Sequence, residues 1–323
     1  MILTQQKCLL LDDKPIPFGV YNDLIKDVNT AYWDKQGMIN KRRRTERKTW
    51  IFAGVFSPEL ICGFAIVDAG MVATAFSYFY SFKTGIFEED KITLPLGFSS
   101  SFNPNLSCDW KLGKYSIKTK DGKMHFQYTG KYKLLMEIEN STNGASIVAP
   151  SKEDRPFNFT YKNLCLPAKV QINNGGTNTY ATSGNYGSID FTKGYPPRTT
   201  TWNWLSFIGK TTAGKIIGVN LVDKFNDNME NILWVDGEKQ LLSSATFTLR
   251  EPLNKEDWNI ATKDGILKCH LVPRGARQEN INAYIMRSKF IQPFGMLDGT
   301  VLLNGVEEKF VAYGVAEDHY ALW

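Results

Sequence analysis

In one segment of the sequence, the turn residues and the alternation of the flanking residues predict the same β-hairpin. Asp121-Gly122 is a dipeptide that supplies the positive φ angles of a two-residue turn. Such a turn gives one face the mainly apolar pairs Tyr115–Tyr128, Ile117–Phe126 and Thr119–Met124. It gives the other face the polar pairs Ser116–Gln127, Lys118–His125 and Lys120–Lys123. Because turn chemistry and alternation indicate the same register, we predict antiparallel strands with one buried face.

The same signals recur along the chain, and helical periodicity is scarce. Asp-Gly or Asn-Gly also occurs at 143–144, 236–237, 264–265, 298–299 and 304–305. Helical spacing is clear only over 18–33, where the apolar residues are Val20, Tyr21, Leu24, Ile25 and Val28. We therefore predict an all-β chain, a barrel or a sandwich, with few short helices.

Composition limits the size and class of the protein. The 323 residues correspond to two domains at about 150 residues each. Hydrophobic residues make up 43% and charged residues 22%, which excludes disordered and fibrous classes. The 5 cysteines are widely spaced and never form a C-x-x-C pair, which argues against a disulfide scaffold or a structural zinc site. We expect reduced thiols in a cytoplasmic protein.

Targeting, membrane and cofactor motifs are not found in the sequence. The apolar run at 8–11 is too short for a signal peptide. Pro58, Glu59 and Asp68 divide the apolar region 50–82 into runs shorter than the roughly 18 residues that cross a bilayer. The 3 histidines form no metal-binding pattern, and phosphate-loop, dinucleotide and G-x-S-x-G motifs are missing. We expect no metal and no cofactor, and these motifs give no support for a hydrolase.

Two segments half a chain apart resemble each other. Residues 61–68 and 216–223 share the pattern I-x-G-x-x-[IL]-V-D. Each follows a basic, threonine-containing approach to a tryptophan, which is Trp50 in the first copy and Trp202 in the second. The repeat predicts duplication of one β domain. Shared strand composition without duplication is the alternative explanation.

The predicted duplication gives two domains, residues 1–168 and residues 169–323. The seam is expected near 166–178, because asparagine and glycine gather at 173–178. A mobile lid beside the seam is the alternative role of this loop.

Three motifs resemble one known family. They are the segments 190–204 (DFTKGYPPRTTTWNW), 290–295 (FIQPFG) and 314–323 (GVAEDHYALW). With the region 47–80, they resemble the DUF2804 family over most of the chain. The resemblance implies two lipocalin-like (calycin) antiparallel β-barrel domains. It implies little chemistry, because the family is named for having no assigned function.

At a greater distance the chain is similar to carotenoid 1,2-hydratases, tocopherol cyclases, fungal pericyclase-type cyclases and a ceramide-handling survival factor. These relatives handle large apolar ligands, often isoprenoids or lipids. The resemblance therefore implies a large apolar ligand, and it assigns no catalytic residue.

The candidate catalytic residues are His319, Glu317 and Asp190. In a strand over 313–323, Glu317 and His319 project from one face, where they can act as an acid–base pair on a ligand or water. Asp190 is a further acid at the start of the first family motif. The alternatives are structural: a salt bridge at the strand end, and an ion pair between Asp190 and Lys193 or Arg198.

The candidate ligand-binding residues are Arg198, Trp202, Trp204, Asn220 and Gln292. The stiff Pro-Pro corner before Arg198 fixes the direction of the chain there. Trp202 and Trp204 share one strand face, and on an inward face they would form an aromatic wall for a flat hydrocarbon or a carbocation. Asn220 lies in the second repeat copy and Gln292 in the second family motif. The alternative is that both tryptophans are plain core residues.

One basic cluster accounts for the net charge of +5, and the rest of the chain is neutral. The cluster consists of Lys41, Arg42, Arg43, Arg44, Arg47 and Lys48, and with the one acid between them, Glu46, the segment 41–48 carries +5. It indicates either docking of a peripheral protein to an anionic membrane surface or a solvated loop whose charge prevents strand-edge aggregation. Nucleic-acid binding is not expected, because an extended basic stripe is missing.

The primary hypothesis is that the chain binds a large apolar ligand, lipid or isoprenoid in kind. The alternative is a hydratase, isomerase or cyclase that uses acid-initiated carbocation chemistry, without a metal or nucleotide cofactor. The enzyme hypothesis requires His319 or an acid beside the tryptophans. A scaffold whose barrels are filled by their own side chains is the third possibility.

Overall fold

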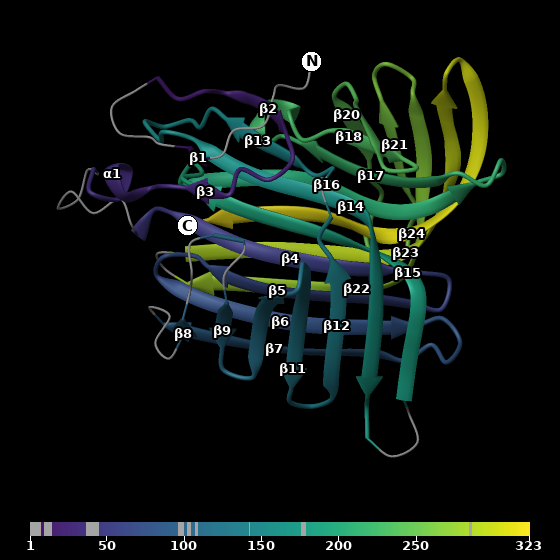
Figure 1. Ribbon diagram of the computed structural model, residues 1–323, viewed down its shortest axis with the longest axis horizontal. Helices are drawn as coiled ribbons and strands as arrows, with labels where there is room; N and C mark the ends of the chain where they lie inside the picture. Colours follow the sequence, from purple (N-terminus) through teal and green to yellow (C-terminus); the bar gives the residue numbers. More distant parts are fainter. Residues whose placement is uncertain are drawn as a thin grey trace. The chain divides into compact units, whose positions relative to one another are not determined.

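The computed structural model describes residues 8–9, 15–36, 45–95, 100–101, 105–106, 109–141, 143–175, 179–283 and 286–323. Nearly all regular structure in these ranges is β-strand, which confirms the all-β class (Figure 1). The helix α1 (Ala31–Asp34) and the 3-10 segment η2 (Asn226–Asn228) are short. Within the described ranges, no helix has the length and apolar character needed to cross a membrane.

Two large antiparallel sheets contain most of the strands. The 13-stranded sheet has the order β7 (Phe87–Pro95), β6 (Val72–Ser81), β5 (Leu60–Asp68), β4 (Lys48–Phe56), β15 (Thr179–Gly194), β14 (Asn158–Asn173), β12 (Lys133–Glu139), β11 (Lys123–Thr129), β10 (Tyr115–Lys120), β9 (Trp110–Leu112) and β8 (Ser100–Ser101), with β13 (Ala145–Ala149) beside β14 and β2 (Gly19–Asn22) beside β13. The 9-stranded sheet has the order β19 (Glu238–Leu241), β18 (Ile232–Val235), β17 (Ile216–Asp223), β16 (Thr199–Thr211), β24 (Val306–Leu322), β23 (Met286–Leu303), β22 (Leu267–Ala283), β21 (Trp258–Thr262) and β20 (Ala245–Thr248). The strands β1 (Cys8–Leu9) and β3 (Asp27–Val28) form a separate parallel pair.

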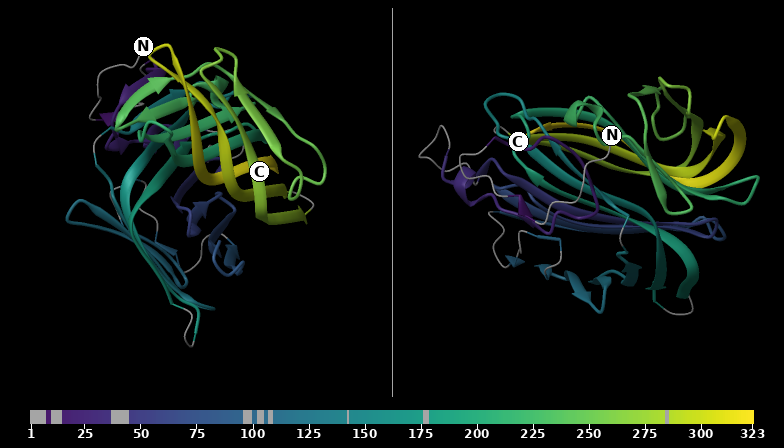
Figure 2. Two further views of the ribbon diagram at one scale, coloured as in Figure 1. Left: turned by 90° about the vertical axis from the view of Figure 1, so that its right-hand side faces the viewer. Right: turned by 45° about the horizontal axis from the view of Figure 1, so that its top comes forward.

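Both large sheets follow the same path. Near the middle of each sheet, an early strand pairs with the strand that comes last in chain order. These pairs are β4 with β15 and β16 with β24. The next three strands extend to one side in chain order, and the later strands return from the other side. The two copies of the sequence repeat occupy equivalent strands, β5 and β17. Each sheet is curled (Figure 2), and together they show the two lipocalin-like barrels that the family resemblance implies.

The chain divides into two compact units. The C-terminal unit comprises Phe56–Ile61 and Pro197–Trp323, and the N-terminal unit contains Cys62–Pro196 and the described residues before Phe56. This division differs from the predicted boundary between residues 168 and 169, which lies within β14. The Asn/Gly-rich segment 173–178, of which 176–178 lie outside the described residues, falls between the end of β14 and its partner β15 in the chain. Asparagine and glycine are common both in the turn of a long hairpin and in a domain linker, so their presence alone does not distinguish a hairpin from a linker.

The hairpin predicted at Asp121-Gly122 is confirmed. The strands β10 and β11 pair in the predicted register, and both turn residues have positive φ, 51° and 74°. Asp298-Gly299, in contrast, lies inside β23. A Cβ on Gly299 would lie 2.1 Å from the carbonyl oxygen of Lys268, so the close approach of β22 requires glycine there.

The helix predicted over 18–33 is wrong for most of its length. Residues 19–22 form β2 and residues 27–28 form β3, while α1 includes only four residues. Val20 is buried opposite Ile147 of β13. The apolar spacing arises because these side chains pack against a sheet, and this tertiary packing overrides the helical pattern.

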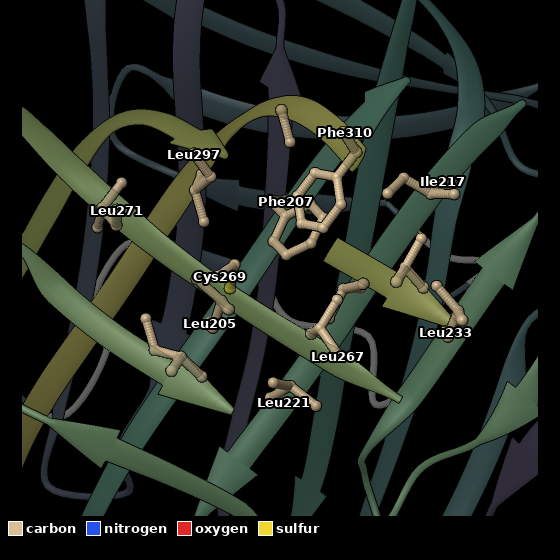
Figure 3. Close-up of a cluster of buried hydrophobic side chains, with 14 of the residues drawn as sticks. Leu205, Phe207, Ile217, Leu221, Leu233, Leu267, Cys269, Leu271, Leu297 and Phe310 are labelled. Atoms are coloured by element: carbon tan, nitrogen blue, oxygen red, sulfur yellow. The ribbon is translucent and has the colours of Figure 1, made fainter. Parts of the chain in front are cut away.

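The hydrophobic core of the C-terminal unit lies on one face of its sheet. Leu205 and Phe207, alternate residues of β16, belong to this core. The rings of Phe207 and Phe310 stack at its centre, with centroids 5.3 Å apart (Figure 3). Because strand residues alternate, Trp202 and Trp204 project from the opposite face of β16. Leu205 and Phe207 therefore face the hydrophobic core, and Trp202 and Trp204 do not.

Two members of the basic cluster are packed into the N-terminal unit. Lys48 is 3% exposed, and its Nζ donates to the carbonyl oxygen of Ala69 over 2.7 Å. Arg47 donates to Thr30 Oγ1 over 2.6 Å and forms an ion pair with Asp34. The other four members, Lys41, Arg42, Arg43 and Arg44, lie outside the described residues. Docking to an anionic membrane stays a prediction for those four.

We predict that Lys48→Ala lowers the free energy of unfolding by about 1–3 kcal/mol, because it leaves buried carbonyl oxygens without their donor. The exposed Lys118 of β10 provides the matched control, and Lys118→Ala should change stability by less than about 0.5 kcal/mol. Urea unfolding followed by circular dichroism measures both. Equal stability of the two variants would show that Lys48 is not a structural residue.

Candidate functional site

The pairing of β16 with β24 brings the C-terminal motif beside the tryptophans. Trp202 lies opposite His319, and Trp204 lies opposite Glu317. On the other side of β24, Phe290 of β23 also lies opposite His319. These side chains all occupy the face of the sheet that is opposite to the hydrophobic core.

Glu317 is the centre of a hydrogen-bonded cluster. Trp202 Nε1 donates to Oε1 over 2.8 Å, and Gln292 Nε2 donates to Oε2 over 3.1 Å. His319 Nδ1 lies 3.3 Å from Oε1. Glu317 is only 7% exposed, and three N–H donors compensate for its loss of water. Both carboxylate oxygens are occupied, so Glu317 is placed to orient its partners.

His319 has a hydrogen-bond partner at each ring nitrogen. Because Nδ1 faces the Glu317 carboxylate, we assign the proton of the neutral ring to this nitrogen, which leaves a lone pair on Nε2. The hydroxyl of Ser288 lies 3.0 Å from Nε2 and can donate to it. We refer to Trp202, Ser288, Gln292, Glu317 and His319 as the Glu317 cluster.

Aromatic rings surround the imidazole of His319. Its centroid lies 4.2 Å from that of Trp202, 5.2 Å from that of Phe290 and 6.5 Å from that of Trp323. Trp202 in turn lies 5.6 Å from Phe225. Their π-faces favour an apolar ligand and stabilise positive charge on the imidazole or on a ligand.

Two buried polar side chains on β22 and β23 extend the cluster. Gln292 uses Nε2 to hold Glu317, and among the described residues its Oε1 has no hydrogen-bond donor. A buried acceptor without a donor costs about 1–3 kcal/mol, so such an atom is normally satisfied by water or a ligand. Arg277 lies opposite Gln292, is 2% exposed and places Cζ 5.2 Å from the Phe290 ring centroid. The site therefore offers a buried acceptor and a buried cation.

Trp204 and Asn220 form a separate network next to the cluster. Trp204 Nε1 donates to Asn220 Oδ1 over 2.9 Å, and Asn220 Nδ2 donates to the carbonyl oxygen of Glu230 over 2.8 Å. These polar atoms are satisfied within the protein. Contact of either side chain with a ligand stays a prediction.

Asp190 and Arg198 are not members of the Glu317 cluster. Asp190 lies on β15 of the N-terminal unit and forms an ion pair with Lys162, both largely buried. Asp190 therefore forms a structural ion pair, and this described partner is neither Lys193 nor Arg198, the two that the sequence indicated. Arg198 has an exposed side chain, and its carbonyl oxygen accepts from the backbone N–H of Trp323 over 3.0 Å. Neither residue has a described contact that supports catalysis.

Ser288, Phe290 and Arg277 were missed by sequence reasoning. Ser288 is 31 residues from His319 in the chain, and no motif connects them. Strand alternation is the signal that could find two of them, because Phe290 and Ser288 occupy every second position before Gln292. Arg277 follows only from the pairing of β22 with β23.

A cavity of about 530 Å³ in the C-terminal unit lies apart from the Glu317 cluster. Its lining includes His270 and Asp298, whose Nε2 and Oδ1 atoms lie 2.9 Å apart, and no member of the cluster. Cys269 also lines it, and burial raises the pKa of this thiol to about 12, so it is not a nucleophile at neutral pH. In the described part of the chain, no group of three or more His, Cys, Asp or Glu side chains is arranged to hold a metal ion.

The family model "Domain of unknown function (DUF2804)" matches residues 2–323. The chain belongs to the DUF2804 family. No curated protein matches this DUF2804 chain in sequence.

Two solved structures are similar to the DUF2804 chain in fold. Kievitone hydratase from Nectria haematococca has a TM-score of 0.58 and 12% identity, over 84% of this chain and 88% of that one. A protein from Nitrosomonas europaea, provisionally named AttH, has a TM-score of 0.56 and 12% identity, over 84% of this chain and 92% of that one. At this identity, the similarity establishes the lipocalin-like fold alone.

We predict that Trp202→Phe lowers the free energy of unfolding by about 1–3 kcal/mol, because Glu317 loses one of its donors. It should also shift the imidazole NMR signals of His319. Trp204→Phe is the matched control: it removes an indole N–H from the same strand face, but this N–H donates to Asn220 and not to Glu317. If both variants shift the His319 signals equally, Trp202 has no specific role in holding the cluster.

Proposed function

We propose that this DUF2804 protein binds a large, apolar, unsaturated ligand at the aromatic face of its C-terminal unit. We further propose that it transfers a proton to that ligand in a hydratase or isomerase reaction. The observation that carries the proposal is the hydrogen bond between His319 and Glu317 within a group of aromatic rings. A histidine held in one tautomer by a carboxylate is a common arrangement for general acid–base catalysis.

The residues of the Glu317 cluster have different roles in the proposed proton transfer. Glu317 orients His319 through Nδ1 and stabilises the imidazolium that forms when Nε2 takes up a proton. The proton then reaches the ligand from Nε2, directly or through the hydroxyl of Ser288. Trp202 and Gln292 hold the Glu317 carboxylate in place while this happens.

The binding half of the proposal rests on the aromatic rings and on Gln292. The rings of Trp202 and Phe290 flank His319, where they can stack on a conjugated ligand and stabilise a cation formed by its protonation. The buried Oε1 of Gln292 is suited to accept a hydrogen bond from a water molecule or a ligand hydroxyl. A water held there would be the nucleophile of a hydration.

The structural relatives support the proposal in a general way. One of them is a hydratase by name, so this fold is compatible with such a reaction. The proposal has two parts, binding of the apolar ligand and proton transfer to it, and each part has its own experiment.

We expect a ligand from a panel of kievitone, retinol, squalene and oleic acid to raise the melting temperature of the protein by several degrees. Lipid extraction and native mass spectrometry of the purified protein should also detect an apolar molecule. If nothing co-purifies and no member of the panel shifts the melting temperature, the binding proposal fails.

For a ligand that binds, we expect incorporation of ¹⁸O from labelled water, or of deuterium from D₂O, into the product. Glu317→Gln should lower kcat about 10²–10⁴-fold, because the replacement no longer orients and charges His319 correctly. Asp318→Asn is the matched control: it neutralises the adjacent carboxylate, which bonds to Asn203 on the other face of the strand. Equal losses in the two variants, or binding without isotope incorporation, would contradict the catalytic half.

A further inference from the structure

Three side chains of the Glu317 cluster form a continuous chain of hydrogen bonds. Ser288 Oγ lies 3.0 Å from His319 Nε2, and His319 Nδ1 lies 3.3 Å from Glu317 Oε1. The order is hydroxyl, imidazole, carboxylate, with each ring nitrogen bonded to a different partner. This is the geometry of a nucleophile, its general base and the group that orients the base.

The strand ladder fixes these three residues relative to each other. Phe290 lies opposite His319, and Ser288 lies opposite Ala321, one step along the same face of β23 and β24. Ser288 therefore approaches the imidazole diagonally across two paired strands. Because the two strands share a long antiparallel ladder, the arrangement does not depend on a loop.

The other two histidines have different environments. His125 lies 3.7 Å from Glu137 on the polar face of the β11–β12 pair. His270 Nε2 lies 2.9 Å from Asp298 Oδ1, and the two side chains are 40% and 44% exposed. Neither has a described contact with a serine hydroxyl. The combination of hydroxyl, imidazole and carboxylate is therefore specific to His319.

We propose that Ser288 is a nucleophile that cleaves carboxylic esters of apolar acids. Ser288 Oγ bonds to the ester carbonyl carbon, and its proton passes to His319 Nε2. The bond to the alcohol oxygen then breaks, and the alcohol leaves with the proton from His319. Water attacks the acyl-serine, gives a proton to His319, and the carboxylic acid leaves as the serine hydroxyl takes that proton back.

Two neighbouring groups suit this reaction. The buried guanidinium of Arg277 lies beside Phe290 on the same face, where its positive charge can stabilise the oxyanion of the tetrahedral adduct. The aromatic rings of Trp202, Phe290 and Trp323 favour an apolar acyl chain. This activity goes beyond the proposed hydration and requires a nucleophilic serine, which hydration does not.

The test is labelling of the full-length protein with an alkyl fluorophosphonate, followed by peptide mass spectrometry. Ser288 Oγ forms a bond to phosphorus, fluoride leaves, and the serine proton passes to His319. We expect one label, on Ser288. If the protein is not labelled, or if the label lies on another residue, the proposal is wrong. Because the mapping uses the unmodified sequence, the result does not depend on whether a variant folds.

Hydrolysis of p-nitrophenyl octanoate provides the second measurement. Ser288→Ala and His319→Gln should each lower kcat by about 10³-fold or more, and Ser288→Ala should abolish labelling. Ser244→Ala, a half-buried serine of the same unit outside the cluster, is the matched control and should leave both readouts unchanged. Equal hydrolysis by Ser288→Ala and the control would overturn the proposal. A ligand-induced rise in melting temperature without labelling would leave the hydration proposal standing and remove this one.

Discussion

The candidate site depends on the pairing of β16 with β24, which are the first and the last strand of the C-terminal sheet in chain order. Trp202 and Glu317 are 115 residues apart in the chain, and this pairing alone brings them within hydrogen-bond distance. Closing so long a loop costs entropy, which the extended ladder between the two strands offsets. The same pairing occurs between β4 and β15 in the other sheet, so it is a property of the repeated fold.

The alternation of strand residues lets the C-terminal sheet carry a core and a polar site together. Leu205 and Phe207 pack on one face, while Trp202 lies on the other with Glu317 and His319. Glu317 on the second face takes its hydrogen bonds from Trp202 and Gln292 of the same face, so the buried charge does not interrupt the hydrophobic packing of the first. A substitution in the cluster therefore acts on the face of the sheet that is opposite to the core containing Leu205 and Phe207.

Local sequence patterns predicted the parts of the structure that local interactions determine. The register of the 115–128 hairpin follows from turn chemistry and alternation, and it was predicted pair by pair. The helical spacing at 18–33 was misleading, because packing against β13 decides the conformation of that segment. The two compact units divide near Pro196-Pro197 and not at the Asn/Gly-rich segment, because asparagine and glycine suit a hairpin as readily as a linker.

The site was predicted only in part, for the same reason. Glu317 and His319 were identified as a pair because they are two residues apart on one strand, and Trp202 because it lies in a family motif. Ser288 lies on the neighbouring strand, 31 residues from His319 in the chain, and no sequence motif connects the two. Asp190 was a plausible acid by proximity in sequence, but its described partner is Lys162 of its own sheet.

The central claim is that Glu317 fixes the tautomer of His319 and leaves Nε2 as the acceptor for Ser288. NMR of protein labelled with ¹⁵N-histidine, at a pH where the imidazole is neutral, tests this claim most directly. We expect a His319 ring with a proton on Nδ1 and a hydrogen-bonded, unprotonated Nε2. A ring protonated on Nε2, or one that exchanges freely between both tautomers, would contradict it.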